Sequence, residues 1–291
     1  MRAGSSGGQP FEVPATFLAY GAPGTPMAAF LDRLPALVRD VVEDWRLTLD
    51  GPARHGRAAL VVPVRTPAGR PAVLKLSSPH EEAEHEHLGL RAWDGRGAVR
   101  LLRADPHRWA LLLERLHGDE DLTSVGDLEA CEVVAGFYAR LHVPALPQLR
   151  RLSSYVDRWT DRLAALPPDA PLPRRLVEQA VSLGRTLVTD RATDARMIHG
   201  DLHGANVLAA DREPWLVIDP KPYVGDPCYD VLQHALNCPE RLVADPVGLA
   251  ERLAALVHLD ADRVRLWLFA RCTIESLERP DLAAAARSLA P

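Results

Sequence analysis

The feature that most constrains this chain is a polar loop over residues 199–206, His-Gly-Asp-Leu-His-Gly-Ala-Asn, followed directly by an apolar hairpin over 207–218. Because a hairpin brings the end of its second strand back to the start of its first, we expect Asp219 beside Asp201 and Asn206. All three side chains offer oxygen atoms, the ligands that Mg²⁺ prefers. Phosphoryl transfer needs such a set, with one carboxylate to deprotonate a hydroxyl and an Asn and an Asp to hold the metal.

Two other interpretations of the loop stand beside this one. His199 and His203 are four residues apart, which resembles half of a zinc site, but such pairs normally lie on a helix. Gly200 and Gly204 oppose a helix here. The second alternative is a polar turn without chemistry. We favour the magnesium site, because three suitable residue types stand at the required spacing beside a hairpin.

Strand-like segments dominate the chain before residue 115. They are residues 45–49, 58–65, 71–76, 101–103 and 109–113. Apolar residues at helical spacing predict a helix over 33–42. A second helix is predicted to begin at Pro79, with Ser78 as its cap and Glu81 three residues after it. These signals predict a five-stranded antiparallel sheet with one inserted helix.

Helical patterns replace strands after residue 118. They cover residues 128–141, 153–166, 172–189, 247–257 and 261–277. The hairpin over 207–218 is the one strand-like stretch of this half. We therefore predict an α+β chain of two lobes: a flexible tail over 1–13, a sheet lobe over 14–113, a hinge over 114–118 and a larger helical lobe over 119–291.

Composition excludes several classes of protein. Hydrophobic residues make up 47% and charged residues 25%, which is ordinary globular composition, and the net charge of −5 argues against a nucleic-acid partner. The start of the chain does not resemble a signal peptide and no stretch suits a membrane span, so we expect no membrane partner. The four cysteines form no Cys-x-x-Cys pair, and we expect reduced thiols and a cytoplasmic protein.

Lysine is rare in this chain. Of 34 basic residues only Lys75 and Lys221 are lysines, and the rest are arginines. A GC-rich genome explains most of that bias. Lys75, however, ends the apolar strand Ala-Val-Leu-Lys, where an edge lysine reaching solvent is the alternative interpretation.

Several motifs together resemble the protein-kinase-like superfamily and, more narrowly, the aminoglycoside phosphotransferase family. The loop matches the kinase pattern His-x-Asp-x-x-x-x-Asn. Residues 95–102, 111–114 and 215–220 are similar to the branch of streptomycin 6-phosphotransferases and hydroxyurea phosphotransferases. The resemblance covers the chain from about residue 14 onward.

The resemblance implies a role for each motif residue. Asp201 would be the catalytic base, with Asn206 and Asp219 as Mg²⁺ ligands. Lys75 would hold the ATP phosphates, paired with a helix carboxylate for which Glu86 is the first choice and Glu82 the second. The remaining implied residues are Glu114 and Leu116 of the hinge at adenine, His199 and Asp230 as supports of the catalytic loop, and Lys221, Asp226, Glu275 and Glu278 as candidate phosphate or substrate contacts.

Departures from the protein-kinase pattern indicate which class of acceptor to expect. Asp219 is followed by Pro220-Lys221, and Gly225 stands six positions after Asp219. This short segment leaves no room for a long loop that could hold a peptide. No Gly-x-Gly-x-x-Gly loop is present. We expect an ATP-dependent kinase of a small molecule, by resemblance streptomycin at its 6-hydroxyl, which confers resistance. Hydroxyurea or another metabolite is the alternative acceptor, and a pseudokinase is the alternative without catalysis. We expect a monomer, with a dimer as the alternative.

Overall fold

The computed structural model describes residues 11–291, and the chain divides into two compact units. The first holds the chain up to His87 together with Arg100–Arg115, and the second holds Leu88–Val99 and Leu116–Pro291. The segment Leu88–Val99 therefore belongs to the second unit, although it lies inside the stretch 14–113 that the sequence assigns to the sheet lobe. Most of the tail predicted over 1–13 lies outside the described residues.

The first unit is an antiparallel sheet with helices before it. Six strands pair in the order β1-β3-β4-β6-β5, and β2 pairs with β3, so the sheet has one strand more than the sequence predicts. The additional strand, β2, is only two residues long and carries no alternating pattern. The bounds are α1 (Ala15–Leu18), α2 (Pro26–Asp44), β1 (Thr48–Leu49), β2 (Arg54–His55), β3 (Ala59–Arg65), β4 (Pro71–Ser77), β5 (Leu101–Asp105), η1 (Pro106–Arg108) and β6 (Ala110–Glu114).

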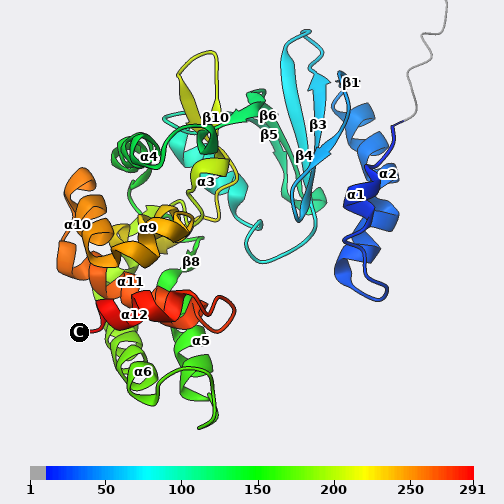
Figure 1. Ribbon diagram of the computed structural model, residues 1–291. Helices are drawn as coiled ribbons and strands as arrows, with labels where there is room; N and C mark the ends of the chain where they lie inside the picture. The colour runs from blue at the N-terminus through cyan, green and yellow to red at the C-terminus, as the bar shows by residue number, and fades with distance from the viewer. Residues whose placement is uncertain (1–10) are drawn as a thin grey trace, which may run out of the picture. The chain divides into compact units, whose positions relative to one another are not determined.

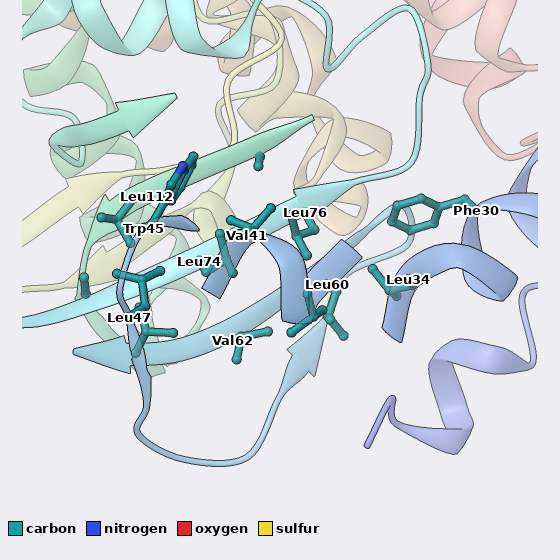
Figure 2. Close-up of a cluster of buried hydrophobic side chains, with 14 of the residues drawn as sticks. Phe30, Leu34, Val41, Trp45, Leu47, Leu60, Val62, Leu74, Leu76 and Leu112 are labelled. Carbon is teal, nitrogen blue, oxygen red and sulfur yellow. The ribbon is translucent and has the colours of Figure 1, made fainter. Parts of the chain in front are cut away.

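Helix α2 packs its apolar stripe against one face of this sheet (Figure 2). The buried cluster joins Leu34 and Val41 of α2 to alternate strand residues such as Leu74 and Leu76 of β4. Successive side chains of a strand point to opposite faces. Lys75 lies between two of these core residues and therefore points to the face that α2 does not cover.

The helix after β4 begins later than the sequence predicts. Residues 81–85 form turns, and α3 (Glu86–Trp93) begins at Glu86. The predicted capping box fails because the Ser78 N–H, which Glu81 would have to accept, donates to the Ala58 carbonyl at 2.7 Å instead. Glu86 is thus the first residue of the helix, whereas a helix beginning at Pro79 would place it about two turns inside.

The second unit is mainly helical (Figure 1). Helices α5 and α6 run side by side, and α11 packs against α10 and α12. All five helices predicted after residue 118 are present, with ends shifted by a few residues. The bounds are α4 (Asp127–Leu141), α5 (Leu152–Ala164), α6 (Arg174–Thr189), α7 (Pro227–Asp230), α8 (Leu232–Leu236), α9 (Pro239–Ala244), α10 (Pro246–Val257), α11 (Ala261–Glu275) and α12 (Leu282–Leu289), with 3₁₀ turns η2 (Leu122–Ser124), η3 (Arg191–Asp194) and η4 (Gly204–Asn206).

Two three-stranded sheets also belong to this unit, in the orders β11-β10-β7 and β8-β12-β9. The prediction of a single strand-like stretch here was wrong. The strands it missed are two to five residues long, too short to show a periodicity of their own. The bounds are β7 (His117–Asp121), β8 (Arg150–Arg151), β9 (Arg196–Ile198), β10 (Val207–Ala209), β11 (Trp215–Val217) and β12 (Tyr223–Gly225). Among the described residues no helix is long and apolar enough to cross a membrane.

Candidate active site

A buried ion pair marks the first unit. Lys75 Nζ lies 2.7 Å from both carboxylate oxygens of Glu86. Lys75 occupies the middle of the sheet, where its neighbours across the strands are Val61 and Leu111. The exposed fractions are 7% for Lys75 and 2% for Glu86. The structure thus pairs the lysine with the first-choice carboxylate.

The hairpin of the second unit brings Asn206 and Asp219 together. Val207 pairs with Val217, and the Ile218 N–H donates to the Asn206 carbonyl at 2.9 Å. Asp219, the next residue, has a φ of +54°, a left-handed conformation that turns the chain sharply at the end of the hairpin. The pairing register of β10 with β11 therefore places Asp219 beside Asn206, as the sequence predicts.

The Asp230 carboxylate supports the start of the catalytic loop. Its oxygens accept hydrogen bonds from the backbone N–H groups of His199 at 3.0 Å and Gly200 at 2.8 Å. His142 Nε2 lies 3.0 Å from the same carboxylate. Burial alone would raise the pKa of Asp230, but the hydrogen bond and charge of His142 outweigh it and hold that pKa below its usual range.

The His199 ring is a packing element of the loop. It is completely buried and stacks on Trp93 with the ring centroids 5.8 Å apart. Its Nε2 lies 3.2 Å from the Ile218 carbonyl. Burial lowers the pKa of His199, and the nearby carboxylate of Asp230 opposes that shift without cancelling it. These contacts account for the histidine without zinc, and across residues 11–291 no three His, Cys, Asp or Glu residues are grouped to hold a metal ion.

Asp201 stands among three polar side chains. Lys221 Nζ lies 3.1 Å from Asp201 Oδ2, and Asn206 Nδ2 lies 3.5 Å from the same oxygen. Asn206 Nδ2 also donates to the Asp201 carbonyl at 2.8 Å, which leaves the amide oxygen of Asn206 for another partner. His203 Nε2 is 3.9 Å from Asp201 Oδ1, and burial lowers the pKa of that histidine.

Asp226 does not fit its predicted role as a substrate contact. It is 2% exposed, and both of its oxygens are engaged inside the second unit. One accepts from the Cys228 N–H at 2.8 Å, and the other accepts from Arg263 Nε at 2.6 Å and Trp267 Nε1 at 2.7 Å. A buried carboxylate with this many donors joins α7 to α11.

The other candidate contacts are Glu275 at the end of α11, Glu278 in the turn after it, and Glu114 and Leu116 of the predicted hinge. Glu275 pairs with the buried Arg271 at 2.9 Å, and Glu278 pairs with Arg162 at 3.1 Å at the surface. The Glu114 N–H donates to the Arg100 carbonyl at 3.0 Å, so that N–H is not open to adenine. Leu116 is the residue at which the chain returns to the second unit.

Two residues of this arrangement had no signal in the sequence. Trp93, which stacks on His199, also donates from Nε1 to the Leu141 carbonyl at 2.9 Å. His142, the partner of Asp230, directly follows α4 and lies more than fifty residues before the catalytic loop. Nothing in their local sequence links either residue to the loop, because the contacts are made by packing of distant segments.

Comparison with known proteins decides the family. The profile described as "Aminoglycoside/hydroxyurea antibiotic resistance kinase" matches residues 44–279 of this chain. The chain belongs to that family. This antibiotic resistance kinase is 41% identical over 264 residues to a streptomycin 6-kinase of Streptomyces glaucescens, covering 87% of this chain and 84% of the relative. It is 40% identical over 274 residues to a hydroxyurea phosphotransferase of Kitasatospora aureofaciens, covering 90% and 77%.

Solved structures show the fold of this antibiotic resistance kinase. A choline kinase of Streptococcus pneumoniae matches with a TM-score of 0.57 at 14% identity, covering 89% of this chain and 99% of that one. A thermostable aminoglycoside phosphotransferase in complex with ADP and hygromycin B matches with a TM-score of 0.54 at 15% identity, covering 87% and 97%. The fold is therefore α+β and protein-kinase-like. The 41% identity to a streptomycin 6-kinase shows that the chain is a phosphotransferase that acts on a hydroxyl group.

Proposed function

We propose that this enzyme transfers the γ-phosphoryl group of ATP to the 6-hydroxyl of streptomycin and so inactivates the antibiotic. The observation that carries the proposal is the placement of Asp201, Asn206 and Asp219 at the base of one hairpin in a chain about 41% identical to a streptomycin 6-kinase. We place the enzyme in the cytoplasm, in keeping with four buried cysteines that are all free thiols. We propose that it acts as a monomer.

The residues at the hairpin fit a bound Mg²⁺. The amide oxygen of Asn206 and the carboxylate of Asp219 are hard oxygen donors, and the Asn206 amide nitrogen is already engaged by the Asp201 carbonyl. Mg²⁺ bound there would neutralise charge on the ATP phosphates. Lys75, held by Glu86, supplies a further positive charge for the α- and β-phosphates.

Asp201 is the proposed base. Its carboxylate accepts the proton of the acceptor hydroxyl while the hydroxyl oxygen bonds to the γ-phosphorus. The bond between that phosphorus and the β–γ bridging oxygen breaks, and ADP leaves with the electron pair. Asp230 and His199 keep the loop that carries Asp201 in place through the hydrogen bonds and stacking described above.

The test is an acceptor panel. Purified protein with ATP and Mg²⁺ is offered streptomycin, other aminoglycosides and hydroxyurea, and phosphorylated products are identified by mass spectrometry. We expect phosphostreptomycin, and Asp201→Asn should lower turnover about 10²- to 10⁴-fold while ATP binding persists. Chelation of divalent metal should abolish turnover. No product with any acceptor, despite ATP binding, would favour a pseudokinase.

Hydroxyurea is the second candidate acceptor, supported by the 40% identical hydroxyurea phosphotransferase. The two acceptors differ in charge, because streptomycin carries guanidinium groups and hydroxyurea is neutral. Competition in one reaction measures the ratio of kcat/KM for the two acceptors directly, and a ratio in favour of hydroxyurea would replace streptomycin as the proposed substrate.

A further inference from the structure

Lys221 is held against the catalytic loop by its backbone as well as its side chain. Its N–H donates to the His199 carbonyl at 2.9 Å. Its own carbonyl lies where a Cβ on Gly200 would approach to 2.2 Å, so the two segments touch backbone to backbone. The side chain then reaches Asp201, with Nζ 3.1 Å from Oδ2. The backbone of Lys221 is therefore held in place, and this fixes the position from which its side chain reaches Asp201.

The two oxygens of the Asp201 carboxylate have different surroundings. Oδ2 receives the Lys221 ammonium and lies 3.5 Å from the Asn206 amide nitrogen. The neighbour of Oδ1 is His203 Nε2, which stands 3.9 Å away, beyond hydrogen-bond distance. The carboxylate is 13% exposed at its side chain, so water can occupy little of the space around it.

We propose that Lys221 is a positioning residue that holds Asp201 through Oδ2 and leaves Oδ1 as the oxygen that takes the acceptor's proton. The proposal rests on the proposed function of Asp201 as base. The proton moves from the acceptor hydroxyl to Oδ1. At the same time the hydroxyl oxygen bonds to the γ-phosphorus, and the bond from that phosphorus to the β–γ bridging oxygen breaks, so that ADP leaves with the electron pair. Lys221 neither gives nor takes a proton in this step.

The residue type fits this role. The chain uses arginine at nearly every other basic position, and both of its lysines lie in ion pairs with carboxylates of the candidate site. An ammonium is a compact point charge that can rest on a single oxygen. A guanidinium prefers to engage both oxygens of a carboxylate, which would occupy Oδ1 as well.

Three variants of Lys221 test the proposal. Lys221→Met removes the charge and keeps most of the length, and we expect kcat to fall about 10- to 100-fold with the KM for ATP within about twofold. Lys221→Arg should also lose turnover, because its fork would engage Oδ1. Lys221→Ala should recover turnover when ethylammonium or propylammonium is added, whereas Asp201→Asn should not.

A matched control keeps the result interpretable. Arg196→Met removes one positive charge from an exposed position on β9 and should leave turnover and thermal stability unchanged. Thermal unfolding of every variant separates loss of fold from loss of positioning. Lys221→Met with wild-type kcat, or Lys221→Ala without amine rescue despite a wild-type melting temperature, would overturn the role of Lys221.

Failure of the proposed function has a different signature. If the wild-type enzyme phosphorylates no acceptor, the same variants are compared in ATP hydrolysis. Water is then the acceptor, and the Asp201 carboxylate takes the proton of that water. Loss of hydrolysis in Lys221→Met together with amine rescue of Lys221→Ala would support the positioning role while the streptomycin proposal fails. Unchanged hydrolysis in both variants would overturn it.

Discussion

The carboxylate of Asp230 accepts a hydrogen bond from the backbone N–H of Gly200 at 2.8 Å, across thirty residues of sequence. A second bond comes from the N–H of His199. One buried side chain therefore holds the backbone on which the proposed catalytic base depends.

Asp230→Asn should destabilise the protein and make its free energy of unfolding depend less on pH in the acid range. We expect a loss of about 1–3 kcal/mol, since one oxygen can still accept a backbone bond while the charge opposite His142 is gone. The pKa of Asp230 is lowered in the folded protein, so its contribution to stability is present above the unfolded pKa of about 3.9 and is lost as pH falls through the lower folded value. Urea unfolding at pH 7 and between pH 5 and 2 measures both effects. An acid response equal to that of the wild type would contradict the assignment.

Lys75→Arg should damage use of the nucleotide although charge is conserved. The Lys75 site is 7% exposed and built around a compact ammonium, so a guanidinium would displace Glu86 or the strand. We expect kcat/KM for ATP to fall at least about tenfold, measured at saturating acceptor. Arg39→Lys, on an exposed helix position, is the control and should leave kcat/KM unchanged. Wild-type kinetics in Lys75→Arg would argue against phosphate contact by this lysine.

Gly200→Ala should disturb the catalytic loop. Gly200 has a φ of +79°, and an added Cβ would lie 2.2 Å from the Lys221 carbonyl oxygen. We expect a loss of about 1–3 kcal/mol in stability and a marked loss of kcat, because the backbone must shift to relieve the contact. The control is Gly136→Ala in α4, where nothing lies within 4 Å and alanine should stabilise the helix by about 0.5–1 kcal/mol. Equal stability of the two variants would contradict the predicted clash between a Cβ at position 200 and the Lys221 carbonyl.

Asp226→Asn should lower stability and leave the acceptor KM unchanged. The substitution weakens a buried carboxylate that Arg263 and Trp267 both contact, and we expect a cost of about 2–4 kcal/mol. Glu278→Gln, whose side chain is 71% exposed, should change stability by less than about 0.5 kcal/mol. Thermal unfolding and acceptor titrations of both variants make the comparison. A raised acceptor KM in Asp226→Asn at unchanged stability would restore the substrate contact that the sequence suggested.

The sequence by itself determined the features that depend on short spacing. Asn206 and Asp219 meet because a hairpin of a dozen residues has one natural register, and Lys75 points away from the α2 core because strand side chains alternate. The larger helices followed from apolar periodicity over three or more turns, whereas the two- and three-residue strands carried no periodicity to detect.

Tertiary structure decided which polar side chains are open and which are engaged. Asp226 stands in a motif beside Asp230 and looks equally available in sequence, yet α11 covers it with Arg263 and Trp267. Glu86 is one of several glutamates in this segment, and only the chain's path through the turns at 81–85 brings it to Lys75. The contact of Lys221 with Asp201 likewise depends on a backbone pairing between two loops. Such contacts join segments whose separation no local pattern encodes, because packing of distant elements sets their distances.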